Sequence, residues 1–147
     1  MRAMLPLTMA LMLWPAACRP QAGRQASAPT TAPATLSQLA TEVGLTFPVS
    51  SRLLGVARES GIDDMVMFKV ELPRRDLESF LAKCPVPADA FEQGSAGFLG
   101  VDDGFWDPSK ATHLRTGQII RNTRATDVGI DDGRPDVAIL YIVNHGT

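Results

Sequence analysis

The chain has 147 residues, of which 45% are hydrophobic and 20% are charged. This composition excludes a wholly disordered chain, which combines low hydrophobicity with high net charge. Residues 36–147 hold eleven basic and sixteen acidic side chains, which gives this part a formal charge of −5. An acidic domain repels nucleic acid, so we expect no nucleic acid among its partners.

The first eighteen residues have the layout of an export signal. Arg2 provides a positive start, and an apolar run extends from Ala3 to Trp14. Twelve residues of helix span only about 18 Å, whereas the hydrocarbon core of a bilayer is about 30 Å thick. The run is therefore too short for a transmembrane anchor, and residues 1–17 are predicted to be a signal peptide that takes no part in the fold.

The end of this signal, Pro-Ala-Ala-Cys at residues 15–18, resembles the cleavage site of bacterial lipoproteins. Pro15 stands where that family prefers Leu, which leaves secretion with an unmodified Cys18 as the alternative. The resemblance implies that Cys18 is acylated, for example with palmitate, and that two or three acyl chains hold the protein in a membrane of the cell envelope. Arg19 replaces the Asp that is linked to inner-membrane retention, which implies the periplasmic face of the outer membrane.

Residues 18–35 are predicted to form the lipidated cysteine and a disordered tether. From Arg19 to Thr35 there is no aromatic, acidic or branched aliphatic residue. Such a segment cannot bury enough apolar surface to offset the entropy lost on ordering. The remaining 112 residues, 36–147, suit one α+β domain.

In the first half of this domain, the patterns predict a helix, a hairpin and a second helix. Apolar residues recur at helical spacing over residues 36–43, with Ser37 as a possible cap. Strands are expected over 52–60 and 65–72, and in the second the positions of Val66, Phe68, Val70 and Leu72 alternate with those of Met65, Met67, Lys69 and Glu71. A helix is then expected from Pro73, whose missing N–H costs nothing in a first turn, to Cys84.

The second half begins with an irregular, glycine-rich stretch over residues 85–115, followed by expected strands at 117–122, 125–130 and 137–143. The last strand is apolar on both faces, so it should lie in the middle of the sheet. The predicted fold is an antiparallel sheet of four to five strands with one or two helices packed on one face.

Motifs for metals, phosphate and nucleophilic catalysis are excluded one by one. An EF-hand aligned on Gly133 would require Val128 as its first ligand, which has no oxygen side chain. His113 and His145 are far apart, and no spacing places two ligands on one helix face, so no metal site is expected. No phosphate-binding loop is present either, and we expect no cofactor. Ser95 lacks the GxSxG context of a nucleophile.

Cys84 is the only cysteine besides Cys18. It ends an apolar helical face, so it is interpreted as a small buried hydrophobe. If Cys18 is not lipidated, a disulfide between the two becomes conceivable.

The irregular stretch holds the residues that we associate with binding: Phe98, Phe105, Trp106, Asp107 and His113. Aromatic side chains offer large rigid contact area and are common at interfaces and in ligand pockets. The structural alternative is that Phe105 and Trp106 close an open edge of the core, with Asp107 as an N-cap before Pro108.

The sequence is consistent with three functions. The first is a non-catalytic module that binds an envelope protein, or an incoming toxin or enzyme, through residues 98–113, alongside the membrane contact of its lipid anchor. The second is a small hydrolase in which His113 works with Asp102, Asp103 or Asp107. The third is a receptor for an apolar or sugar ligand stacked on Trp106. A solvated His113 favours binding, whereas a cleft that joins His113 to a carboxylate and a hydroxyl favours catalysis.

Overall fold

The computed structural model describes residues 34–61 and 64–147, so the signal peptide, Cys18 and most of the tether lie outside the described residues. The α-helices are α1 (Leu36–Val43) and α2 (Leu77–Leu81). The strands are β1 (Arg52–Glu59), β2 (Met65–Pro73), β3 (Glu92–Gln93), β4 (Leu114–Arg121), β5 (Arg124–Asp131) and β6 (Val137–Gly146). Short 3₁₀ turns are η1 (Arg74–Asp76), η2 (Ala88–Ala90), η3 (Ala96–Leu99) and η4 (Pro108–Lys110).

The strands form one antiparallel sheet in the order β1-β2-β6-β5-β4-β3. It has six strands, not the four to five expected. The additional strand is β3, which pairs only Glu92 with Thr116 and Gln93 with Arg115. Two residues are too few for an alternating pattern, which is why the sequence did not indicate this strand.

β6 lies between β2 and β5, as its apolar character predicted. It pairs with nine residues of β2 and eight of β5. A strand in this position has both edges hydrogen-bonded, and both of its faces are covered where it is most apolar, from Ala138 to Val143.

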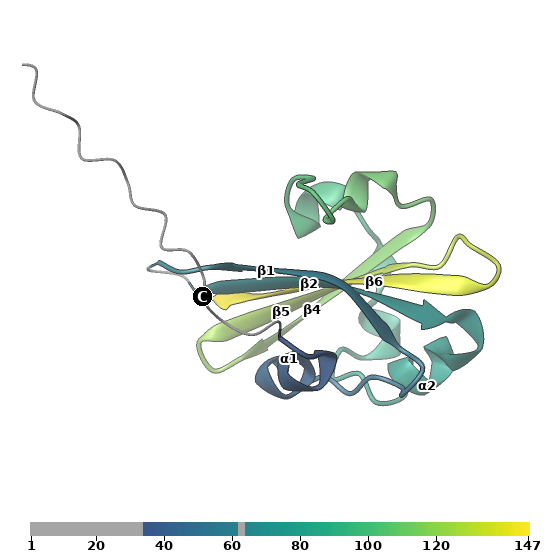
Figure 1. Ribbon diagram of the computed structural model, residues 1–147, viewed down its shortest axis with the longest axis horizontal. Coiled ribbons are helices and arrows are strands. Elements are labelled where there is room, and N and C mark those ends of the chain that lie inside the picture. Colours follow the sequence, from purple (N-terminus) through teal and green to yellow (C-terminus); the bar gives the residue numbers. More distant parts are fainter. Residues whose placement is uncertain (1–33, 62–63) are drawn as a thin grey trace, which may run out of the picture. The chain divides into compact units, whose positions relative to one another are not determined.

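The two α-helices pack on one face of the sheet, as expected (Figure 1). α1 is capped by Thr35, not by Ser37: the Thr35 side chain accepts from the Gln38 N–H, and the Gln38 side chain accepts from the Thr35 N–H. Gly44 ends α1 in the left-handed conformation. The predicted second helix is shorter than expected, because Pro73 ends β2 and η1 intervenes before α2 begins. Leu39 of α1 and Phe80 of α2 are fully buried against Phe68 of the sheet.

The opposite face of the sheet is covered by the insert, which we define as residues 94–113 (Figure 1). It includes η3 and η4 and contributes Leu99 and Trp106 to a second apolar cluster with Ile139, Tyr141 and Val143 of β6. The sheet is therefore covered on both faces. We call the face that carries the α-helices the helix side, and the face that carries the largely irregular insert the insert side.

Candidate functional site

Trp106 belongs to the core. Its side chain is only 1% exposed, and its ring meets Tyr141 edge to face at 5.3 Å between centroids. The indole Nε1 donates a hydrogen bond to the carbonyl oxygen of Leu99 at 3.0 Å. A ring enclosed in this way has no face on which a ligand could stack, so Trp106 packs the insert against the sheet.

Phe105 and Phe98 occupy different surroundings. Phe105 lies over Gly55 of β1, where an added Cβ would come within 2.3 Å of its ring. Phe98, by contrast, is 45% exposed at the surface of η3. Of the aromatic residues predicted for binding, Phe98 therefore offers the most surface to a partner.

Asp107 does not cap η4 with its side chain, although Pro108 does begin that turn as expected. Its carboxylate is instead paired with Lys69 of β2 and accepts a hydrogen bond from the Tyr141 hydroxyl at 3.1 Å. Burial alone would raise the pKa of Asp107, but the Lys69 ammonium and the Tyr141 hydroxyl outweigh it and lower the pKa. The same burial and the neighbouring carboxylate raise the pKa of Tyr141. These contacts fix the insert to the sheet.

His113 is exposed and contacts Asp132 through Nδ1. Asp132 also pairs with Arg115 at 2.9 Å. Burial would raise the pKa of Asp132, but the hydrogen bonds from His113 and Arg115 lower it. His113 is thus brought to a carboxylate, but not to one of the three that the sequence suggested: Asp102 binds Ser109, and Asp107 binds Lys69. Among the described residues, the His113 ring makes no hydrogen bond to a hydroxyl, so the structure brings together only the histidine and the carboxylate of the hydrolase hypothesis.

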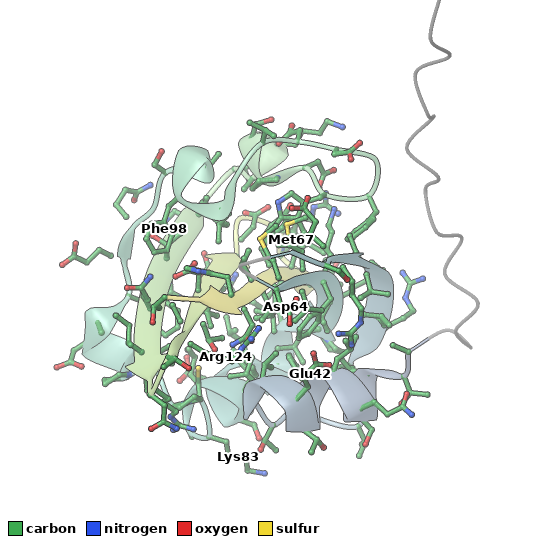
Figure 2. The ribbon with its side chains drawn as sticks, turned by 90° about the vertical axis from the view of Figure 1, so that its left-hand side faces the viewer. Glu42, Asp64, Met67, Lys83, Phe98 and Arg124 are labelled. Carbon is green, nitrogen blue, oxygen red and sulfur yellow. The ribbon has the colours of Figure 1, made fainter. Side chains whose placement is uncertain are left out.

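A groove of about 610 Å³ lies on the insert side of the sheet, next to Phe98. The insert covers the sheet at Tyr141, but it leaves the ends of the strands around Met65 and His145 open. In Figure 2, Phe98 and Met67 lie on the insert side, whereas Glu42 and Lys83 lie on the helix side. The groove is lined by Glu59, Met65, Met67, Gly97, Phe98, Leu99, Gly100, Val101, Asp103, Asp127, Val143, His145 and Gly146.

Strand register explains why these side chains share one surface. Directly paired residues of an antiparallel sheet point to the same face. Met65 is paired with His145 and with Glu59, while Val143 is paired with Met67 and with Asp127. The groove floor is therefore two neighbouring rows of side chains that cross β1, β2, β6 and β5.

The groove floor also holds a histidine–carboxylate pair that no sequence motif indicated. His145 Nε2 lies 3.1 Å from Oδ2 of Asp127, whose Oδ1 accepts a hydrogen bond from Gln118 at 2.6 Å. Asp127 is almost fully buried. The two residues are eighteen positions apart on adjacent strands, so only the register could have indicated the pair. The sequence does indicate an apolar surface at Met65 and Met67, because they lie on the face of β2 opposite to Val66 and Phe68.

The rim of the groove is shaped by two glycines of the insert. Gly100 and Gly104 have φ angles of +90° and +57°, which favour glycine because it has no Cβ. Asp103 and Trp106, on either side of Gly104, form an isolated β-bridge that closes the turn. Val101, in the same stretch, is 87% exposed. The backbone thus presents an apolar side chain and a carboxylate on one rim.

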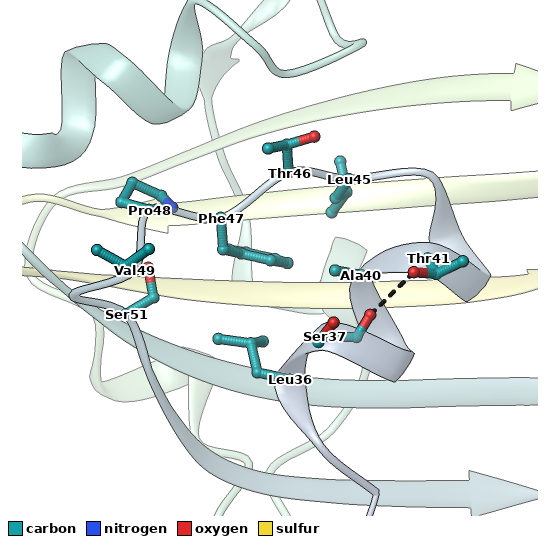
Figure 3. Close-up of a pocket in the computed structure, with 10 residues that line it drawn as sticks. All are labelled: Leu36, Ser37, Ala40, Thr41, Leu45, Thr46, Phe47, Pro48, Val49 and Ser51. Atoms are coloured by element: carbon teal, nitrogen blue, oxygen red, sulfur yellow. Dashed lines mark hydrogen bonds between the residues drawn. The ribbon is translucent and has the colours of Figure 1, made fainter.

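A second hollow, of about 440 Å³, lies on the helix side between α1 and the segment that leads to β1 (Figure 3). Its lining includes Phe47 and the fully exposed Val49, but no charged residue. The Ser51 hydroxyl beside it is buried without a hydrogen-bond partner. This hollow is less suited to specific recognition than the groove, which combines apolar and charged groups.

Three further observations concern metals, thiols and membranes. Within residues 34–61 and 64–147, no three His, Cys, Asp or Glu side chains come close enough to hold a metal ion. Cys84 is partly buried against the helix-side core, and burial raises the pKa of its thiol. No helix in the described part of the chain is long and apolar enough to cross a membrane.

Comparisons with known proteins leave the geometry as the basis for assigning a function. A scan against protein-family models, a search of curated proteins and a search of solved structures each found no match.

Proposed function

We propose that this chain is a non-catalytic binding module of the cell envelope, held by lipid on Cys18 at the periplasmic face of the outer membrane. Its binding site is the groove on the insert side, and its partner is an envelope protein. The observation that supports binding is the open, partly apolar end of an otherwise covered sheet face, with Phe98 and Val101 exposed beside Met65 and Met67. Exposed apolar surface of this kind is characteristic of interaction sites.

The groove favours binding over catalysis because it lacks a hydroxyl, thiol or amine nucleophile. Among the described residues, its lining includes the His145–Asp127 pair, but no Ser, Thr, Cys, Lys or Tyr. A histidine and carboxylate without a neighbouring hydroxyl or thiol do not form the arrangement used in covalent hydrolysis. The pair instead offers hydrogen-bonding groups in an apolar surface, which gives a binding site its specificity.

The groove assignment predicts that loss of apolar side chains at its rim will weaken binding. In the double variant Phe98→Asn and Val101→Asn, capture of the partner by in-cell crosslinking should fall at least about tenfold, because each side chain contributes more than about 1 kcal/mol when buried. Val49→Asn is the matched control, since Val49 is also an exposed valine but lies in the hollow on the helix side. Equal capture by wild type and the double variant contradicts this site.

The anchoring proposal rests on the sequence of residues 1–18 and has a separate test. Mass spectrometry of the mature N-terminus should find an acylated Cys18, and Cys18→Ser should move the protein from the membrane fraction to the soluble fraction. Two or three acyl chains bind essentially irreversibly, so the expected shift is nearly complete. An unmodified Cys18, or a mature chain that begins elsewhere, contradicts the anchor but leaves the groove assignment intact.

A further inference from the structure

The groove carries an excess of negative charge that the fold does not neutralise. Glu59 at its β1 end and Asp103 on its rim take part in no ion pair among the described residues. Asp127 is the third acid, and in the part of the chain that the structure describes His145 is the only basic residue in the lining. Carboxylates that share an apolar surface with no Lys or Arg attract a cationic group.

The nearest basic side chains are directed elsewhere. Arg58 precedes Glu59, but it forms a bidentate pair with Glu42 of α1, at 2.6 and 2.8 Å. Arg124 donates to Asn144 at 2.7 Å, on the helix side. Lys69 lies one row further along the insert side and is held by Asp107. These three cations of the described strands are therefore held away from the groove, and Glu59 and Asp103 are left to pair with a ligand.

We infer that the groove binds a segment of a partner protein in which Lys or Arg lies among apolar side chains. This inference rests on the proposed function and adds the chemistry of the partner. The apolar residues of the segment contact Met65, Met67, Val143, Phe98 and Val101, and its basic side chains pair with Glu59 and Asp103. The floor crosses four strands, about 14 Å at the usual strand spacing, which is the length of about four extended residues.

The test compares two synthetic peptides. One has the sequence Gly-Lys-Leu-Val-Leu-Lys-Gly, and its control carries Gln in place of both Lys. The protein is purified in the form that cells accumulate and, where it carries lipid, is held in zwitterionic nanodiscs. Each peptide carries a neutral dye, and its binding is measured by fluorescence anisotropy, with empty nanodiscs as the blank. The Lys peptide should bind about five- to tenfold more tightly at low salt, because it forms two exposed ion pairs that the Gln peptide cannot form.

A matched pair of variants tests where the selectivity originates. In the double variant Glu59→Gln and Asp103→Asn, the Lys peptide should bind no better than the Gln peptide. The control, Glu78→Gln and Asp89→Asn, removes two exposed acids of α2 and η2 and should retain the selectivity. High salt should also reduce the difference, because exposed charges are screened.

The outcomes separate this inference from the proposed function. Equal binding of the two peptides, or no binding of the Lys peptide at about 1 mM, overturns the selection of a cationic segment. If the crosslinked partner nevertheless depends on Phe98 and Val101, the groove remains a binding site for a partner of other chemistry. If the peptides show no selectivity and the partner does not depend on those residues, both proposals fail.

Discussion

Replacement of Trp106 by alanine is expected to lower the free energy of unfolding by about 3 to 5 kcal/mol, the usual cost of truncating a buried Trp or Phe. The side chain is 1% exposed and fills the space between the insert and Tyr141. It also donates the hydrogen bond that holds the Leu99 carbonyl. A domain of this size is stable by only about 5 to 15 kcal/mol, so the variant should lose a large part of its stability.

Urea unfolding followed by circular dichroism measures this change. Trp106→Phe retains most of the apolar contact but loses the indole N–H, and should cost less than the alanine variant. Phe98→Ala, an aromatic truncation in the same insert at an exposed site, should change stability by no more than about 1 kcal/mol. If Trp106→Ala and Phe98→Ala lower the free energy of unfolding by equally small amounts, Trp106 does not fix the insert to the sheet.

Asp131→Ala is also expected to lower the free energy of unfolding, by about 2 to 4 kcal/mol. Oδ1 of Asp131 accepts hydrogen bonds from three backbone N–H groups: those of Thr112 and His113 at 3.2 and 3.0 Å, and that of Gly133 at 3.2 Å. The residue is 3% exposed. Removal of the carboxylate leaves these donors without their partner. A fully buried unsatisfied group costs about 1 to 3 kcal/mol, and the expected loss is below the sum for three because Thr112, His113 and Gly133 are exposed to water.

Thermal and urea unfolding of three variants distinguishes this explanation from a general sensitivity of the β5–β6 connection. Asp131→Asn keeps an oxygen acceptor but loses the charge, so its stability should lie between those of wild type and the alanine variant. Asp136→Ala changes an exposed residue of the same connection and should cost no more than about 0.5 kcal/mol. Similar losses for Asp131→Ala and Asp136→Ala contradict the role assigned to the carboxylate.

Most of the sheet could be predicted from local patterns. β2 alternates Val66, Phe68 and Val70 with less buried residues, and β6 is apolar on both faces, which placed it in the middle of the sheet. β4 begins at Leu114, three residues before the expected start, because Leu114 to Thr116 pair with the end of β5. Pairing between distant segments fixes such a boundary, so composition near Gly117 could not reveal it.

The candidate site was less predictable, because its residues meet only through tertiary structure. An aromatic pair in an irregular stretch is equally consistent with a binding surface and with a cover for the core, and for Trp106 the partners that decide the matter lie on η3 and β6. Phe98 was among the residues predicted for binding, and the structure places it beside the groove. Asp127 and His145 have no sequence pattern in common, since strand register alone brings them together.

The central position of β6 has a consequence for how the chain acquires its structure. β6 follows all the other strands along the chain, yet both β2 and β5 pair with it. During synthesis, the β1–β2 and β4–β5 hairpins therefore emerge as separate halves that no strand pairing joins until residues 137–146 are available. Contacts between segments so distant in sequence form slowly. If the chain is exported as proposed, this delay helps to keep it unfolded until it has passed through the membrane.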